Sequence, residues 1–123
     1  MAVARVSFCR RQGDASMFVC EWHIDIPFGR QAEVVDILTA WNSAKFEHTE
    51  FRRVRSHRLL VGHVGVSPSH VIDSYVFETL SDFEAATKSL SNPLLKPHSD
   101  AIAPLIVPGS QQWRVFRLVG EQK

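Results

Sequence analysis

The stretch that decides the fold of this chain is Phe18-Val-Cys-Glu-Trp-His-Ile-Asp-Ile26. One of its faces is entirely apolar, and the other carries an imidazole between two carboxylates. The apolar face consists of Phe18, Cys20, Trp22, Ile24 and Ile26, and the other face of Val19, Glu21, His23 and Asp25. A period of two residues is that of a β-strand. The sequence therefore predicts a strand that buries only one of its faces in the core.

The segment that follows this strand is predicted to be a helix over residues 30–46. Its apolar stripe, spaced by three and four residues, consists of Val34, Ile37, Leu38 and Trp41, with the stem of Lys45 covering the end. Asn42 is expected to face water on the opposite side of the helix. This helix would pack its stripe against the apolar face of the first strand.

The remaining elements complete an alternating order of strands and helices. Strands are predicted over 54–64, 71–80 and 111–119, and the first two of these form a hairpin. Ser81-Asp-Phe-Glu84 matches a capping box that starts a second helix. Prolines prevent residues 93–108 from forming one regular helix. The order is β-α-β-β-α-β, the split βαβ pattern of a ferredoxin-like α+β domain.

This architecture leaves one face of the sheet without helices. The strands predicted over 54–64 and 71–80 are apolar on both faces, which water would not cover favourably. We therefore expect a homodimer in which two sheets bury these faces against each other.

Length and composition exclude several classes of protein. The chain has 123 residues, 45% of them hydrophobic, and a formal net charge of +1. These values fit one domain over residues 17–120, preceded by an extension over residues 1–16. The near-zero charge argues against a nucleic-acid partner, and the absence of a long apolar run argues against a membrane span. Cys9 and Cys20 form no disulfide framework, so we expect a reducing, cytoplasmic compartment.

Several short motifs, in their order and spacing, resemble the dimeric α/β-barrel superfamily, and within it the NIPSNAP-like proteins. They are Pro27-Phe28-Gly29-Arg30, His57-Arg58-Leu59-Leu60-Val61-Gly62, the run from Tyr75 to Glu84, Asn92-Pro93 and Pro108-Gly109-Ser110. The resemblance covers roughly residues 18 to 119. It implies that two ferredoxin-like protomers join their sheets and that each half-barrel encloses a pocket.

A more distant resemblance is to the antibiotic-biosynthesis monooxygenases, a group that includes haem-degrading enzymes. The segment Ser91–His98 is similar to the one where those proteins place a histidine, which ligates iron in the haem degraders. Two departures count against haem chemistry. Phe77 stands where those enzymes have a tryptophan, and Glu21, His23 and Asp25 occupy the strand where they have an asparagine.

The candidate site residues follow from these patterns. His23 and His98 are the predicted proton-transfer residues, because an imidazole exchanges protons near neutral pH and neighbouring carboxylates orient it. Tyr75 is a third predicted catalytic residue, with its hydroxyl expected to reach into the barrel near His23. The predicted substrate-binding residues are Glu21, Asp25, Arg55, His57 and Phe77.

Two groups of these residues leave alternatives open. Arg55 belongs to a basic cluster with Arg52, Arg53 and Arg58, which either grips a substrate carboxylate or forms a solvated edge or subunit salt bridges. His57 and His63 lie six residues apart, roughly 20 Å along a strand, which is too far for one metal ion. No metal or other cofactor is expected.

The sequence therefore predicts a homodimer that binds a small hydrophobic or aromatic molecule in its half-barrel pocket. If the protein is an enzyme, the predicted classes are cofactor-independent monooxygenase, isomerase or cyclase. One alternative is a non-catalytic interaction or accessory protein whose barrel is filled by side chains. A second alternative is a haem-binding or haem-degrading protein.

Overall fold

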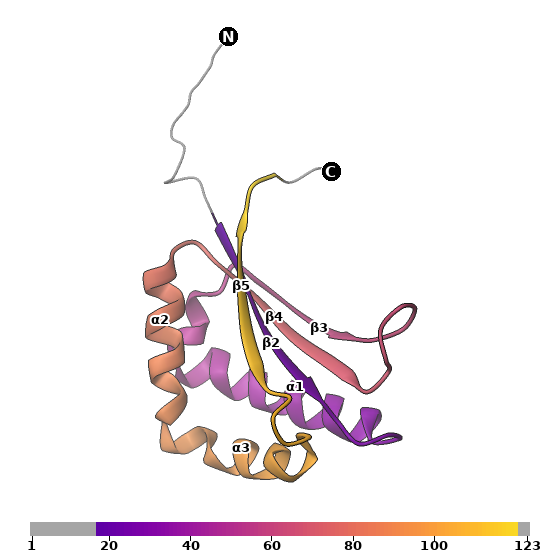
Figure 1. Cartoon of the computed structure of the whole chain (residues 1–123). Coiled ribbons are helices and arrows are strands. Elements are labelled where there is room, and N and C mark those ends of the chain that lie inside the picture. The colour runs from indigo at the N-terminus through magenta and orange to yellow at the C-terminus, as the bar shows by residue number, and fades with distance from the viewer. Residues whose placement is uncertain (1–16, 121–123) are drawn as a thin grey trace.

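The computed structural model describes residues 17–120, so the predicted extension over residues 1–16 lies outside the described residues. Four strands form one antiparallel sheet in the order β3-β4-β2-β5 (Figure 1). Their bounds are β2 Met17–Asp25, β3 Ser56–Val61, β4 His70–Phe77 and β5 Gln112–Leu118. The strand predicted from the alternating stretch is β2, and it lies in the interior of the sheet.

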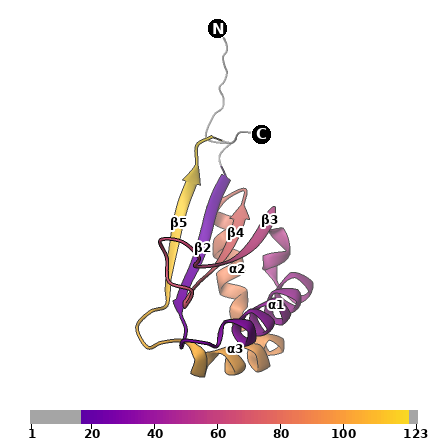
Figure 2. The ribbon, with the colours of Figure 1, turned by 90° about the vertical axis from the view of Figure 1, so that its right-hand side faces the viewer.

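Three helices lie on one side of this sheet (Figure 2). They are α1 Gln31–His48, α2 Leu80–Lys88 and α3 Lys96–Ile102. The proline-rich segment after α2 is broken into short 3₁₀ turns on either side of α3, over residues 93–95 and 103–105. The predicted β-α-β-β-α-β order and ferredoxin-like α+β class are therefore confirmed. No helix among residues 17–120 is long and apolar enough to cross a membrane.

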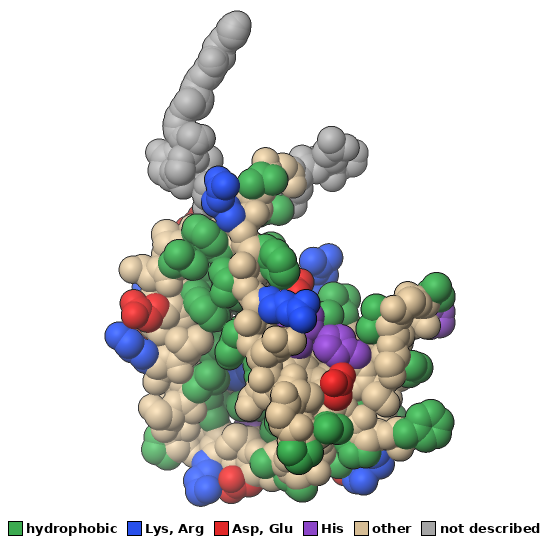
Figure 3. All heavy atoms as spheres, viewed as in Figure 1, with side chains coloured by type: hydrophobic (Ala, Val, Ile, Leu, Met, Phe, Trp, Pro, Cys, Tyr) green, Lys and Arg blue, Asp and Glu red, His purple; other side chains and the backbone are tan. Residues whose placement is uncertain are grey.

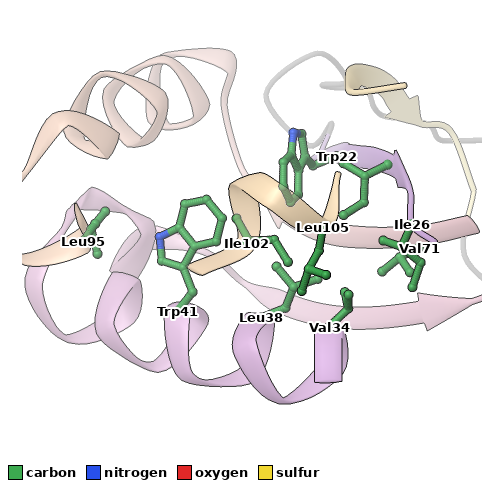
Figure 4. Close-up of a cluster of buried hydrophobic side chains, with 10 residues drawn as sticks. Trp22, Ile26, Val34, Leu38, Trp41, Val71, Leu95, Ile102 and Leu105 are labelled. Carbon is green, nitrogen blue, oxygen red and sulfur yellow. The ribbon is translucent and has the colours of Figure 1, made fainter. Parts of the chain in front are cut away.

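The core lies between the helices and the sheet face that carries Trp22 and Ile24 (Figure 4). One part of it packs β2, α1 and α3 together, and the rings of Trp22 and Trp41 meet edge-to-face at 5.8 Å. A second part surrounds Phe51, Tyr75 and Phe77 beneath α2. Burial of these large side chains is the main stabilising term of the fold.

Two local predictions are wrong. The N-cap of α2 is Thr79, whose hydroxyl accepts a hydrogen bond from the Asp82 backbone N–H at 3.0 Å, so Ser81 and Glu84 do not form a capping box. Thr79 keeps an extended backbone at the end of the strand, and the helix therefore begins two residues earlier than expected. Asn42 does not face water but is buried against β4, where it finds polar partners.

Within residues 17–120 no helix lies on the other face of the sheet, and we call it the open face. Residues directly opposite each other on paired strands point to the same side, so the strand register identifies its members. Val19, Val76 and Phe116 lie in one row across the sheet, and Phe116 is 51% exposed. The next row contains both charged and polar side chains, namely Arg58, Ser74, Glu21 and Arg114.

The loop between β3 and β4 folds back closely on the end of β3. Gly62 donates its backbone N–H to the His70 carbonyl oxygen at 3.0 Å. A Cβ atom placed on Gly62 would lie 1.9 Å from the Ser67 carbonyl oxygen, so no side chain fits at this position. The absence of a side chain at Gly62 thus determines the path of the loop beside the open face.

We expect Gly62→Ala to lower the free energy of unfolding by about 2 kcal/mol, because the loop backbone must move to admit the methyl group. Urea denaturation measures this change. Gly120→Ala is the matched control, since no atom of the described residues lies within 4 Å of a Cβ there. Equal stabilities of the two variants would contradict the prediction.

Candidate functional site

The strand register divides the predicted site residues between the two faces of the sheet. Glu21, His23 and Asp25 lie on the open face, whereas His57, Tyr75 and Phe77 point toward the helices. The expectation that the Tyr75 hydroxyl reaches His23 is wrong. Tyr75 lies opposite Cys20 in the register, and Cys20 belongs to the face that is buried under the helices.

On the open face, four side chains form a continuous chain of hydrogen bonds, which we call the relay. Asp25 Oδ1 lies 2.8 Å from Nδ1 of His70, His70 Nε2 lies 2.8 Å from Nδ1 of His23, and His23 Nε2 lies 2.9 Å from Oε1 of Glu21. Both nitrogens of both rings are engaged in this way. Neither histidine therefore has a free nitrogen to offer a substrate while the relay is closed.

An apolar hollow of about 300 Å³ lies beside the relay on the open face. Its lining residues come from β3, β4 and the loop between them: Leu60, Val61, Gly62, His63, Val64, Val66, His70 and Ile72. His70 is thus shared by the hollow and the relay. In Figure 3, histidine and acidic side chains adjoin on this face, next to hydrophobic side chains.

On the opposite face, five polar side chains gather between α1 and the sheet, and we call them the buried cluster. They are Asn42, Lys45, His57, Asp73 and Tyr75. The Asp73 carboxylate is at its centre and is 1% exposed. It accepts hydrogen bonds from Asn42 Nδ2 at 3.0 Å and the Tyr75 hydroxyl at 2.9 Å, and it is also bonded to His57 Nε2. Three residues thus form hydrogen bonds directly with the buried carboxylate, and Lys45 is connected to it through Tyr75.

Lys45 supplies the positive charge of the buried cluster. Its Nζ atom donates to the Tyr75 hydroxyl at 3.0 Å and lies 4.1 Å from the centre of the Trp41 ring. Burial lowers the pKa of Lys45 from 10.5 to about 8, and attraction to Asp73 opposes this shift. Burial also raises the pKa of Tyr75 well above 10, and the charge of Asp73 and its hydrogen bond act in the same direction. The Tyr75 hydroxyl consequently keeps its hydrogen at neutral pH.

His57 is the member of the buried cluster that reaches the surface. Its side chain is 20% exposed, whereas that of Asp73 is fully enclosed. An ionised carboxylate can only accept a hydrogen bond, so His57 Nε2 carries a hydrogen, and in the neutral ring Nδ1 is the nitrogen with the lone pair. No residue within 17–120 forms a hydrogen bond with this Nδ1 atom. The Phe46 ring packs edge-on against the imidazole, with ring centres 5.3 Å apart. An oriented imidazole with one free nitrogen is the arrangement of a general base.

The remaining predicted residues lie apart from both networks. Arg55 is half-exposed and forms an ion pair with Glu78 at the edge of the sheet. His98 lies on α3 and is partly buried. Phe77 is fully buried and packs against Phe51 and Phe83 as part of the core.

Four residues of the two networks were not among the predicted site residues: Asn42, Lys45, His70 and Asp73. A signal for two of them was present in the sequence. Lys45 lies in phase with the apolar stripe of its helix. Asp73 lies in phase with Val71, Tyr75 and Phe77, on the same buried face of β4. A charged residue in phase with buried positions indicates an internal partner.

Among the residues that the structure describes, no group of three or more histidine, cysteine or acidic side chains is arranged to hold a metal ion. Cys20 is buried as a free thiol, and burial raises its pKa to about 12. Both networks therefore consist of hydrogen-bonding and proton-exchanging side chains only.

Solved structures of other proteins have the same fold as this chain. A NIPSNAP family protein of Agrobacterium tumefaciens superposes with a TM-score of 0.65 and 19% identity, over 84% of this chain and 86% of that chain. A NIPSNAP-like domain protein of Burkholderia xenovorans superposes with a TM-score of 0.64 and 18% identity, over 85% of each chain. The fold is that of the NIPSNAP structures.

A candidate antibiotic biosynthesis monooxygenase of Chloroflexus aurantiacus is also similar, with a TM-score of 0.60 and 16% identity over 87% of this chain and 97% of that one. The predicted resemblance to both groups is therefore confirmed at the level of the fold. No family model and no curated protein sequence matches the chain.

The lowered pKa of Lys45 leads to a testable prediction of how the free energy of unfolding depends on pH. Between the folded pKa of about 8 and the unfolded value of 10.5, the unfolded chain keeps a proton that the folded chain has lost. The contribution of Lys45 to the free energy of unfolding therefore rises with pH. Relative to Lys45→Met, the wild type should gain about 1 kcal/mol between pH 7 and 9, measured by urea denaturation.

Lys88→Met is the control for this experiment, because Lys88 is an exposed lysine on α2. Its stability difference from the wild type should stay constant over the same range. A constant difference for Lys45→Met as well would show that the Lys45 amine is not desolvated in the folded protein.

Proposed function

We propose that this protein is a homodimeric enzyme that removes a proton from a small hydrophobic or aromatic molecule without a cofactor. The observation that carries this proposal is the pairing of His57 with Asp73. The imidazole is hydrogen-bonded to a carboxylate that is almost fully enclosed, its side chain is 20% exposed, and no residue within 17–120 forms a hydrogen bond with its Nδ1 atom. A carboxylate in this position orients the imidazole and stabilises its protonated form.

In this proposal His57 is the catalytic residue, and the other members of the buried cluster position it. The substrate transfers a proton to Nδ1 and keeps the electron pair, while Asp73 balances the charge of the imidazolium. Asn42 and Tyr75 hold Asp73 in place through hydrogen bonds. Tyr75 and Lys45 are 0% and 3% exposed, so they act through Asp73 and do not contact the substrate.

Removal of this proton is the first step of an isomerase, a cyclase or a cofactor-independent monooxygenase reaction. An isomerase returns the proton to a different atom of the substrate anion, and a cyclase uses the anion to form a new bond within the molecule. A monooxygenase lets the anion react with dioxygen, so that one oxygen atom enters the substrate and the other leaves as water. Fold likeness to candidate monooxygenases supports the third class without distinguishing it from the others.

Proton abstraction can be tested before the natural substrate is known. Anthrone is an aromatic ketone with an acidic methylene group, and proton NMR in deuterated water follows the exchange of its methylene hydrogens. We expect the wild type to accelerate this exchange, and His57→Gln to lower the acceleration by about 100-fold or more.

His48→Gln is the control, because the His48 side chain is 40% exposed at the end of α1 and lies near Glu47, outside both networks. It should retain the full exchange rate, and dioxygen uptake in the same samples then distinguishes oxygenation from isomerisation. Equal rates for wild type and His57→Gln would remove His57 as the base.

A second candidate function is a non-catalytic accessory or interaction protein. The observation that favours it is the enclosure of the buried cluster, whose members other than His57 are at most 3% exposed and bind one another. A network of this kind can have a purely structural role, in which it specifies how α1 packs on the sheet. Failure of the wild type to accelerate proton exchange in any acidic aromatic compound would favour this reading. The haem-binding alternative depends on His98, which belongs to neither network.

The dimeric part of the proposal depends on the open face. Its apolar members include Val19, Ile72 and Phe116, and none of the described helices covers them. We expect analytical ultracentrifugation to give the mass of a dimer for the wild type. Phe116→Asp should give the mass of a monomer, because it places a charge in the middle of the interface.

Leu94→Asp is the matched control, since Leu94 is 57% exposed but lies on the helix side, in the turn before α3. It should leave the mass unchanged. A monomeric wild type, or a dimer that survives Phe116→Asp, would contradict docking through the open face.

A further inference from the structure

The relay on the open face has three hydrogen-bonding contacts, but two neutral imidazole rings supply hydrogens for only two of them. Each of the three contacts, Asp25–His70, His70–His23 and His23–Glu21, requires one hydrogen. A neutral imidazole carries one hydrogen on its two nitrogens, and an ionised carboxylate carries none. The closed relay therefore holds one hydrogen in excess of two neutral imidazoles and two carboxylates.

We propose that His23 and His70 share this proton, and that it acts as a clasp that joins the end of β2 to the start of β4. The two rings lie side by side on adjacent strands, with their centres 5.0 Å apart. Glu21 and Asp25 hold the outer nitrogens, so the only contact left for the additional proton is the one between the rings. The clasp stands independently of the proposed catalytic site, which lies on the other face.

The charges around the relay come from every element that borders it. Glu21 and Asp25 on β2 favour a positive charge on the ring pair. Arg114 on β5 lies opposite Glu21, and Arg58 on β3 lies opposite Ser74, so both oppose that charge from the neighbouring row. His63 lies in the loop that lines the hollow with His70. The carboxylates are in direct contact with the rings, whereas no ion pair joins either arginine to a residue within 17–120, so the carboxylates dominate.

Loss of the shared proton would leave two nitrogen lone pairs facing each other at 2.8 Å. Water cannot easily relieve this contact, because His23 is 5% exposed. One ring must therefore turn away, and His70 is the more exposed of the two. His70 also lines the hollow with its side chain, and its backbone forms hydrogen bonds with Gly62 and Ser67 in the adjoining loop. The clasp thus couples the proton to the wall of the hollow.

The expected effect on stability has a definite sign. Unfolded histidines lose their protons above a pH of about 6.5, whereas the folded relay retains one. Wherever the folded state binds more protons than the unfolded state, the free energy of unfolding falls as the pH rises. The stabilisation by the clasp is therefore present near pH 6.5 and is lost as the pH rises above it.

His70→Gln is the informative variant, because a glutamine amide can donate to His23 Nδ1 without taking up a proton. Between about pH 6.5 and 8.5, the unfolding equilibrium constant of the wild type should rise about tenfold relative to that of this variant. Urea denaturation of the full chain at several pH values measures it. The contributions of Lys45 and Cys20 are common to both proteins and cancel in the comparison.

Nitrogen NMR of histidine-labelled protein tests the shared proton directly, and His48→Gln is the control for the labelling and for stability. At pH 7.5 the proposal expects one imidazolium equivalent distributed over the His23 and His70 signals, and neutral His23 in His70→Gln. Neutral shifts for both rings in the wild type would overturn the proposal. The same pH dependence of stability in the wild type and His70→Gln would also overturn it.

Discussion

Asp73 places a carboxylate in the layer between α1 and the sheet, and much of the surrounding structure satisfies it. An isolated charge in this layer would be prohibitively costly, so the residues that face it must provide hydrogens or positive charge. Asn42 from α1 and His57 from β3 bind it directly, and Lys45 approaches it through the Tyr75 hydroxyl. One buried carboxylate therefore determines how three elements meet, and His57 is the member of the buried cluster that reaches the surface, with its side chain 20% exposed.

The two faces of the sheet use the same chemistry in different surroundings. On the helix side, one carboxylate serves several donors and the charges are enclosed by aromatic rings. On the open face, two carboxylates hold two imidazoles, and the ends of the relay remain accessible, with the Asp25 side chain 52% exposed. The first arrangement suits a fixed base, because its geometry cannot relax. The second suits a reversible contact, because the His70 side chain is 24% exposed in the protomer and borders the hollow.

Much of the fold could be predicted from hydrophobic periodicity. The alternation in β2 and the stripe of α1 identified the core faces correctly, and the prolines after α2 identified the broken segment around α3. The start of α2 was placed wrongly because Thr79 and Ser81 are both good caps, and only the end of β4 decides between them. Asn42 was assigned to the surface because its polarity is typical of exposed positions, whereas its partner Asp73 lies 31 residues away.

The site was predicted less completely, for a reason that follows from strand pairing. His23 with its two flanking carboxylates could be recognised from one strand, since those three residues are neighbours in sequence. Their connection to His70 depends on the register between β2 and β4, and so does the separation of His23 from Tyr75. A shift of one residue would exchange the two faces. Hydrophobic periodicity specifies which residues share a face and which elements they form. Which polar residues meet depends on strand register and helix packing, because hydrogen bonding between distant segments follows a register that no local pattern specifies.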